Sequence, residues 1–109
     1  MPKKAVGCAV ETAIEIVGGK WKVLILQELF SGVKRFSELH RALSGVSHRT
    51  LTQQLRELER HGIVNRNIYR QVPPKVKYSL TPVGETLRPV IGVMHDWAEE
   101  YSRTRVKKR

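Results

Sequence analysis

The sequence is poor in cysteine and in long apolar runs. Cys8 is the only cysteine among 109 residues, which excludes an intramolecular disulfide and argues against a cysteine-based zinc site. The four histidines, at 40, 48, 61 and 95, lack the close spacing of metal ligands, so we expect no metal and no other cofactor. No apolar stretch approaches the roughly 20 residues of a membrane span, and no signal peptide is visible. We therefore expect a cytoplasmic protein with no membrane partner.

Signatures of catalysis are also missing. Gly18-Gly19-Lys20 is not a phosphate-binding loop, because Ile14 replaces the first glycine of that motif and Trp21 replaces its Ser or Thr. No nucleophile, histidine and acid occur together with a supporting local motif. The sequence predicts that the protein is not an enzyme.

Acidic residues are half as frequent as basic ones, and the excess of base is clustered. The chain has 20 Lys and Arg against 10 Asp and Glu, a net charge of +10. Ten of the basic and three of the acidic residues lie between positions 31 and 80. Clustered base indicates a polyanionic partner, namely DNA, RNA or an anionic membrane surface.

The hydrophobic pattern predicts a mainly α protein with one β-hairpin. Apolar residues recur with helical spacing and then, in one short region, at every second position. The expected helices cover 9–17, 20–30, 38–43, 48–61 and about 82–103, and the expected strands cover 64–72 and 75–80. Ser37, Ser47 and Thr81 are the expected N-caps of three helices, with Pro82 favouring a helix start. Trp21, Leu24, Ile25 and Leu29 are the expected buried stripe of the second helix.

The fourth helix, 48–61, carries the strongest indication of DNA binding. Leu51, Leu55 and Leu58 fall on one face at about 100° per residue, and three arginines and a glutamine fall on the other. Arg contacts guanine and Gln contacts adenine through paired hydrogen bonds in the major groove. The expected contacts come from Ser47, His48, Arg49, Thr50, Thr52, Gln53 and Arg56. Arg60 lies further along the helix and is expected to meet phosphate or Glu57.

The hairpin after this helix predicts a basic wing at about 64–80. Its second strand alternates, with Val76, Tyr78 and Leu80 on one face and Lys75, Lys77 and Ser79 on the other. Basic side chains on a hairpin reach phosphates or a minor groove, and they also protect an edge strand from aggregation. Both interpretations stay open, with DNA contact expected at Arg66, Arg70, Gln71, Lys75 and Lys77.

Four segments together resemble the HxlR-type winged helix regulators, which are related to the MarR family. They are GGKW at 18–21, RFSEL at 35–39, LTQQLRELE at 51–59 and VPPKVKYSLT at 72–81. The resemblance covers about residues 8–101 of what we expect to be a single domain, 1–109, with the helix-turn-helix at about 37–61. It implies a homodimer that binds a palindromic operator and controls transcription, with repression the commoner mode. Lys77 departs from the family, which often has an acidic residue there.

Cys8 lies where many members of that family have a cysteine that senses oxidants or electrophiles. Lys3, Lys4 or the helix N-terminus would favour its reactive thiolate by lowering the pKa of the thiol. However, Ala9 replaces the proline that usually follows the family cysteine. Cys8 is therefore either a redox sensor or a small packing residue, and an oxidant or small-molecule signal is compatible with the sequence.

The first and last helices are expected to form the dimer interface. The last helix repeats apolar residues about every 3.5 positions. The resulting apolar stripe is long for so small a domain. The expected interface residues are Val10, Ile14, Leu87, Val90, Ile91, Met94, Trp97 and Tyr101. A two-fold dimer would place two recognition helices about 34 Å apart, one turn of B-DNA.

Two other functions use the same fold. An RNA-binding module would need exposed aromatic residues for stacking, and Tyr69 is the only candidate in the basic region. A protein-interaction adaptor would bind its partner without binding DNA. The sequence favours duplex DNA over both.

Overall fold

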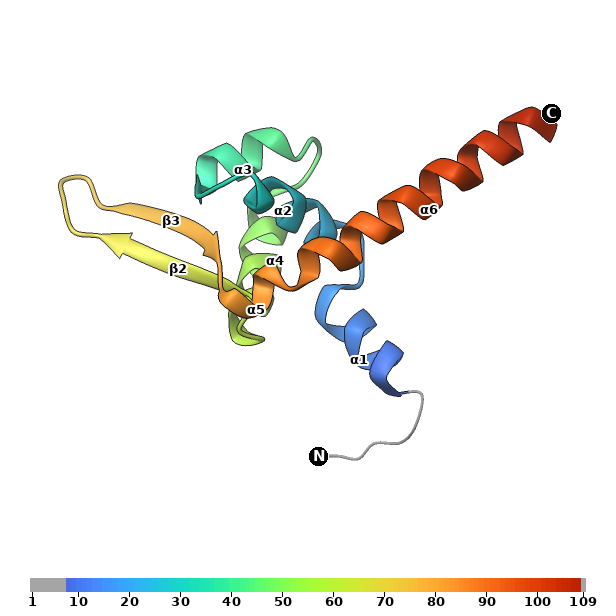
Figure 1. Cartoon of the computed structure of the whole chain (residues 1–109). Coiled ribbons are helices and arrows are strands. Elements are labelled where there is room, and N and C mark those ends of the chain that lie inside the picture. The colour runs from blue at the N-terminus through green and yellow to red at the C-terminus, as the bar shows by residue number, and fades with distance from the viewer. Residues whose placement is uncertain (1–7, 109) are drawn as a thin grey trace.

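A computed structural model of the protein describes the backbone of residues 8–108 and the side chains of residues 8–105 (Figure 1). Six helices and three short strands follow one another along the described chain. The elements are α1 Cys8–Val17, α2 Trp21–Phe30, β1 Lys34–Arg35, α3 Phe36–Ala42, α4 His48–Arg60, β2 Val64–Tyr69, β3 Lys75–Leu80, α5 Pro82–Glu85 and α6 Leu87–Lys108. The predicted mainly α fold with a β-hairpin is confirmed.

The core lies between α2, α3, α4 and one face of the sheet. Its fully buried side chains come from three helices and the start of β2, and they include Ile25, Leu26, Leu39, Leu51, Leu55, Leu58 and Val64. The stripe predicted for α2 is only partly correct. Trp21 and Leu24 are half-buried at the edge of the core, whereas Leu26 and the charged Lys22 are buried.

Helices α3 and α4 form the helix-turn-helix. Ser47 caps α4 as predicted, because its hydroxyl oxygen accepts a hydrogen bond from the Thr50 N–H at 3.0 Å. Gly62 ends the segment in the left-handed region, with φ +74°, where a side chain would be strained. The predicted cap of α3 is wrong. Arg35, not Ser37, is its N-cap, and the Glu38 carboxylate accepts the Arg35 backbone N–H at 2.8 Å.

The sheet has three antiparallel strands in the order β1-β3-β2, one more than predicted. Strand β1 pairs Lys34 with Tyr78 and Arg35 with Lys77. In the hairpin, Arg66 lies opposite Tyr78 and Ile68 opposite Val76. Strand β2 ends at Tyr69, three residues before the predicted end, and the turn covers 70–74.

The expected last helix is divided in two. Thr81 caps α5 by accepting the Gly84 N–H at 2.9 Å, with Pro82 in the first turn, as predicted. The helix then breaks at Thr86, because Pro89 has no N–H to continue the hydrogen-bond ladder to Glu85. Helix α6 begins at Leu87 and continues to Lys108, beyond the expected end near 103.

Helices α1 and α6 project from the body on the side opposite the hairpin (Figure 1). The radius of gyration is 16.2 Å, compared with about 13 Å for a compact chain of this length. The extended shape leaves both helices exposed over most of their length. Within residues 8–108, no helix combines the length and the apolar composition needed to cross a membrane.

Candidate nucleic-acid interface

The outward face of α4 presents the arginine and glutamine side chains predicted for it. Leu51, Leu55 and Leu58 are buried. Arg49, Gln53, Arg56 and Arg60 are exposed. Because the leucines determine which way the helix docks, the polar face is fixed towards solvent. This face therefore has the donors needed to contact base edges or phosphates.

The first turn of α4 is held by its own hydrogen bonds. Ser47 uses its hydroxyl oxygen for the cap, and the Thr52 hydroxyl donates to the His48 carbonyl oxygen at 2.9 Å. Thr50 is half-buried. These residues therefore contribute to positioning the helix, whereas Arg49, Gln53 and Arg56 have the freely extended polar groups.

His48, at the start of α4, packs against the ring of Phe36 from α3, with ring centroids 4.6 Å apart. The His40 ring completes the cluster, 6.2 Å from each of the other two, and its Nε2 lies 3.0 Å from the Val46 carbonyl oxygen. Sequence reasoning did not identify this contact. It fixes the spacing between the two helices of the helix-turn-helix at the end predicted to meet DNA.

A cleft of about 400 Å³ separates α4 from the hairpin. Arg56 lines it from α4 and Arg66 from β2, over a floor that includes Leu55, Val76 and Tyr78. The structure therefore brings two of the predicted DNA-binding arginines together from different elements.

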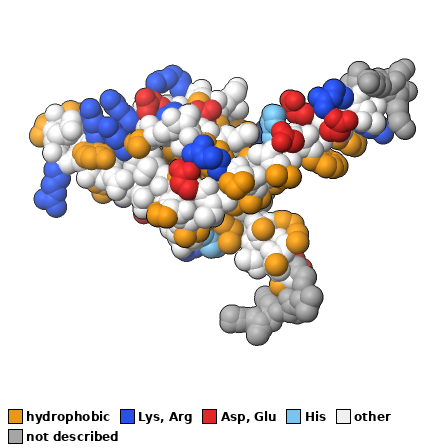
Figure 2. Space-filling model, in the orientation of Figure 1, with side chains coloured by type: hydrophobic (Ala, Val, Ile, Leu, Met, Phe, Trp, Pro, Cys, Tyr) orange, Lys and Arg blue, Asp and Glu red, His pale blue; other side chains and the backbone are white. Residues whose placement is uncertain are grey.

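The basic residues of the predicted wing divide between the two faces of the sheet. Arg66 shares the α4 side with Val76 and Tyr78. Lys75 and Lys77 lie on the opposite side, where the Lys77 Nζ is 5.2 Å from the centroid of the Tyr69 ring. Arg70 and Gln71 are exposed in the turn. Figure 2 shows Lys and Arg side chains gathered over the hairpin.

A partly buried ion pair joins α4 to α2. Lys22 Nζ lies 2.5 Å from Glu57 Oε1, and only 8% of the lysine side chain is exposed. The hydrogen bond and the charge of Lys22 lower the pKa of the Glu57 carboxyl. The expected contact between Arg60 and Glu57 is not the one formed, because Glu57 turns towards α2 and Arg60 stays exposed.

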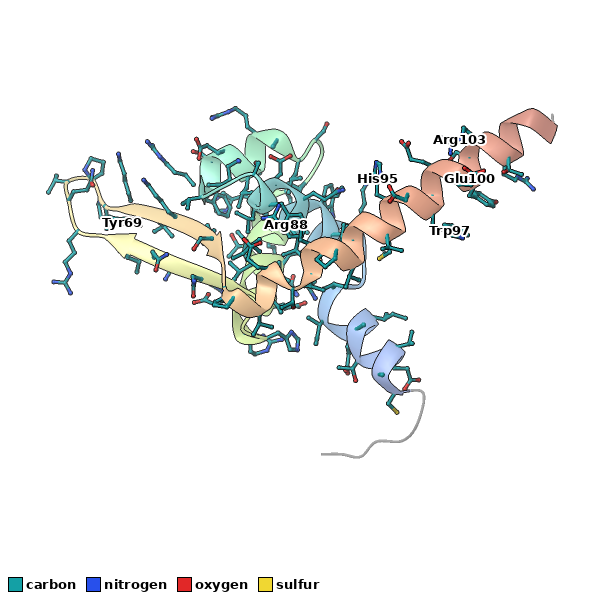
Figure 3. The ribbon with its side chains drawn as sticks, in the orientation of Figure 1. Tyr69, Arg88, His95, Trp97, Glu100 and Arg103 are labelled. Carbon is teal, nitrogen blue, oxygen red and sulfur yellow. The ribbon has the colours of Figure 1, made fainter. Side chains whose placement is uncertain are left out.

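Most residues predicted for the dimer interface form an exposed apolar surface. Val10 and Ile14 on α1, and Val90, Met94, Trp97 and Tyr101 on α6, are each about half to two-thirds exposed. The Trp97 and Tyr101 rings stack with centroids 5.3 Å apart. Figure 3 places Trp97 on the lower side of α6 and His95 on the upper side, and Figure 2 shows hydrophobic side chains along that lower side and on α1.

Two residues of that prediction belong to the interior of the protomer. Ile91 is 4% exposed, and the half-buried Leu87 packs against the same core. Leu87 and Ile91 lie on the side of α6 that packs against the core. The exposed apolar residues lie on the adjacent side of the helix, which faces solvent. Val93, which is 67% exposed, was not predicted and continues the exposed surface.

Cys8 begins α1 and is half-buried. Partial burial raises the pKa of its thiol, and a hydrogen bond with Glu11 raises it further. The expectation that the start of α1 lowers the pKa of the Cys8 thiol is therefore wrong. Lys3 and Lys4, which the expectation also invoked, lie outside the described residues.

Comparison with known proteins identifies the family. The HxlR-like helix-turn-helix family model matches residues 16–106. The HTH-type transcriptional regulator YdeP of Bacillus subtilis (strain 168) is 55% identical over 95 residues, covering 87% of this chain and 74% of YdeP. The redox regulator HypR in its reduced form superposes with a TM-score of 0.85 and 44% identity over 93% of this chain and 99% of HypR.

A third protein, diamide-treated YodB from B. subtilis, superposes with a TM-score of 0.74 and 35% identity over 85% of this chain and 92% of YodB. The match to the family model spans α2, the helix-turn-helix, the hairpin and nearly all of α6. The chain belongs to the HxlR-like helix-turn-helix family of transcriptional regulators.

Proposed function

We propose that this protein is a homodimeric repressor that binds a palindromic operator in duplex DNA. The observation that carries the proposal is the exposed face of α4, where Arg49, Gln53 and Arg56 extend from a helix anchored by three buried leucines. A helix of this kind fits the major groove and reads base edges through Arg and Gln.

The wing and the dimer complete the proposed interface. Arg66, Arg70, Gln71, Lys75 and Lys77 supply contacts to phosphates or to the adjacent minor groove. The exposed apolar residues of α1 and α6 are the surface that a second copy would cover. A two-fold dimer repeats the α4 face at a spacing of about 34 Å, which matches successive major grooves on one side of the duplex.

Binding is tested by electrophoretic mobility shift with the DNA upstream of the protein's own gene. We expect a specific complex whose affinity falls steeply with salt, because several phosphates are contacted. Arg49→Ala and Gln53→Ala should each reduce discrimination against a scrambled duplex by about tenfold or more. Lys75→Ala should weaken binding to both duplexes equally.

Arg103→Ala on α6 is the matched control, because it removes one exposed arginine far from α4 and the hairpin. Normal operator affinity in Arg49→Ala would show that α4 is placed wrongly. Preference for RNA of the same sequence would favour the RNA-binding function, and partner capture without any DNA shift would favour the adaptor. Repression is tested separately by a reporter for the bound promoter, whose expression should rise when the regulator is deleted.

A second proposal is that oxidation of Cys8 changes operator affinity. It is supported by the similarity to HypR, which is named as a redox regulator, and by the half-exposed position of the thiol on α1. Cys8 is the only cysteine in the chain, so its disulfide would join two molecules or join Cys8 to a small thiol. Diamide should change affinity in the parent protein and leave Cys8→Ser unaffected.

The raised pKa of Cys8 predicts how this reaction depends on pH. The thiolate is the reactive form, and burial together with Glu11 keeps the thiol protonated at neutral pH. The rate of reaction with iodoacetamide should therefore rise with pH up to and beyond the ordinary thiol pKa of 9.0. Glu11→Gln should increase the rate at pH 7, with Glu15→Gln as the control. A rate that is already maximal at pH 7 would contradict this prediction.

A further inference from the structure

The face of the sheet that points away from α4 concentrates positive charge. We define this outer face by Arg35, Asn67, Tyr69, Lys75 and Lys77. Cross-strand partners lie on the same side of a sheet, and neighbouring residues of a strand alternate between sides. Since Tyr78 and Val76 turn towards the core, Lys75 and Lys77 turn outward, and the pairing of Arg35 with Lys77 places both on this face.

Arg35 and Lys77 form a like-charged pair across β1 and β3. Directly opposed residues of an antiparallel pair have Cβ atoms about 4.5–5.5 Å apart, and like charges at that spacing destabilise the sheet. The Lys77 ammonium leans away from β1 and lies 5.2 Å from the centroid of the Tyr69 ring on β2. The ring attracts a cation without neutralising it.

Glu38, an acidic residue beside Arg35, is already engaged in the cap of α3. Glu38 accepts the Arg35 backbone N–H through Oε1 at 2.8 Å. Its carboxylate offsets part of the Arg35 charge, and the hydrogen bond and the neighbouring cations lower the pKa of Glu38. None of the residues that define the outer face is acidic. The outer face is thus a sheet surface with three cations and a hydrogen-bonding amide.

We infer that the outer face is a phosphate-binding site at which Arg35 and Lys77 hold one phosphodiester of the DNA backbone, beyond the bases read by α4. The guanidinium of Arg35 supplies paired donors and the ammonium of Lys77 supplies charge. Bound phosphate relieves the repulsion that the register imposes on the free protein. The inference rests on the proposed function, and it adds Arg35, which sequence analysis did not predict, to the DNA contacts.

The charge of the outer face and its position next to the turn of the hairpin favour DNA as the molecule bound there. Lys75 extends the same face towards the turn, where Arg70 and Gln71 are exposed. Several cations along one hairpin fit the repeated phosphates of one DNA strand. An acidic protein surface is the alternative, and binding to DNA would then be independent of this face.

The inference predicts opposite effects on folding and on binding. Lys77→Glu replaces repulsion from Arg35 with attraction, so the variant should unfold at a higher urea concentration than the parent. The same change removes a cation from the phosphate site and places an anion there. Affinity for operator DNA should fall about tenfold or more, and the slope of log K against log salt should decrease by about 0.9.

The experiment measures urea unfolding and salt-dependent operator binding for Lys77→Glu, Arg35→Gln and the control Lys20→Glu. Lys20 precedes α2 in the segment that links it to α1, away from the sheet (Figure 1). We expect weaker binding and a smaller salt slope in both sheet variants, with the control close to the parent. Arg35→Gln leaves the backbone contact to Glu38 in place, so it tests binding without loss of the helix cap.

Several outcomes would overturn the inference. Unchanged DNA binding in both sheet variants would assign the outer face to another partner, and an equal loss in Lys20→Glu would show a general effect of net charge. Lower stability of Lys77→Glu would contradict the repulsive pair. If the parent protein binds no DNA, both the proposed function and the inference fail. If the parent and both sheet variants bind DNA equally well, only the inference fails.

Discussion

The backbone at Gly84 leaves no room for a side chain. A Cβ built there would lie 2.2 Å from the Ile63 carbonyl oxygen, a backbone atom that cannot rotate away. This close approach joins α5 to the segment between α4 and β2, where Thr81 also contacts Gly62 and Ile63. We predict that Gly84→Ala lowers the free energy of unfolding by about 1–3 kcal/mol, measured by urea denaturation.

Gly92→Ala is the matched control for this prediction. Gly92 lies within α6 with no atom near the position of a Cβ, on the face opposite Val90 and Met94. The same substitution should therefore stabilise the protein by roughly 0.5–1 kcal/mol, through the better helix propensity of alanine. Equal effects of the two changes would show that the contact at Gly84 is unimportant.

Residues whose role depends on their own helix were predictable from sequence, and residues whose role depends on a distant partner were not. The Ser47 cap and the buried leucines of α4 follow from spacing along one helix. Lys22 is buried because Glu57, 35 positions later, neutralises it. Ile91 is in the core because α6 crosses the body at that point. Ile91 has the same helical spacing as Val90 and Met94, so the sequence did not show that Ile91 is in the core while the other two are exposed.

At the scale of elements, the ion pair between α2 and α4 makes stability depend on pH. Lys22 holds the pKa of Glu57 below its ordinary value of 4.5, so the folded protein favours the charged carboxylate more than the unfolded chain does. The stabilisation is present above the unfolded pKa and is lost as the pH falls through the lower, folded pKa. We predict that Glu57→Gln unfolds with a weaker pH dependence below about pH 4.5 than the parent.

The measurement is urea unfolding at a series of pH values from 7 to 3. Lys22→Met should show the same loss of acid sensitivity, because it removes the other member of the pair. Glu59→Gln, an exposed position on the same helix, should keep the parent's profile. A Glu57→Gln profile parallel to the parent's would mean that other carboxyls, such as Glu38 with its lowered pKa, dominate acid unfolding.

The elements missed or misplaced in the sequence prediction are those with little local signal. Strand β1 has only two residues and exists because Lys34 and Arg35 pair with β3 more than 40 positions later. The break at Thr86 was hidden by a continuous apolar pattern, although Pro89 provided the physical reason for it. The long helices and the hairpin were predictable because their periodicity spans six or more residues.

At the scale of the whole molecule, the exposed apolar side chains of α1 and α6 are the basis of the proposed dimer. Val90, Val93, Met94 and Trp97 are each about half to two-thirds exposed on one side of α6. Exposed apolar patches of this kind mark protein interfaces, and α1 presents Val10 and Ile14 as further exposed apolar side chains. Sequence periodicity located this surface, because its residues recur along single helices.

We predict that Trp97→Glu converts the proposed dimer to a monomer, because it places a charge in the centre of the apolar surface. Light scattering coupled to size-exclusion chromatography should report half the parent's mass, while the circular dichroism spectrum keeps its helical form. Operator affinity should fall by about 10²–10⁴-fold, since two linked half-site contacts become one. Glu99→Gln, on the polar side of α6, should remain dimeric and bind normally. Arg49→Ala should lose operator binding and keep the mass of the dimer. A parent protein that is monomeric at micromolar concentration, or a Trp97→Glu variant that stays dimeric, would refute the proposed assembly.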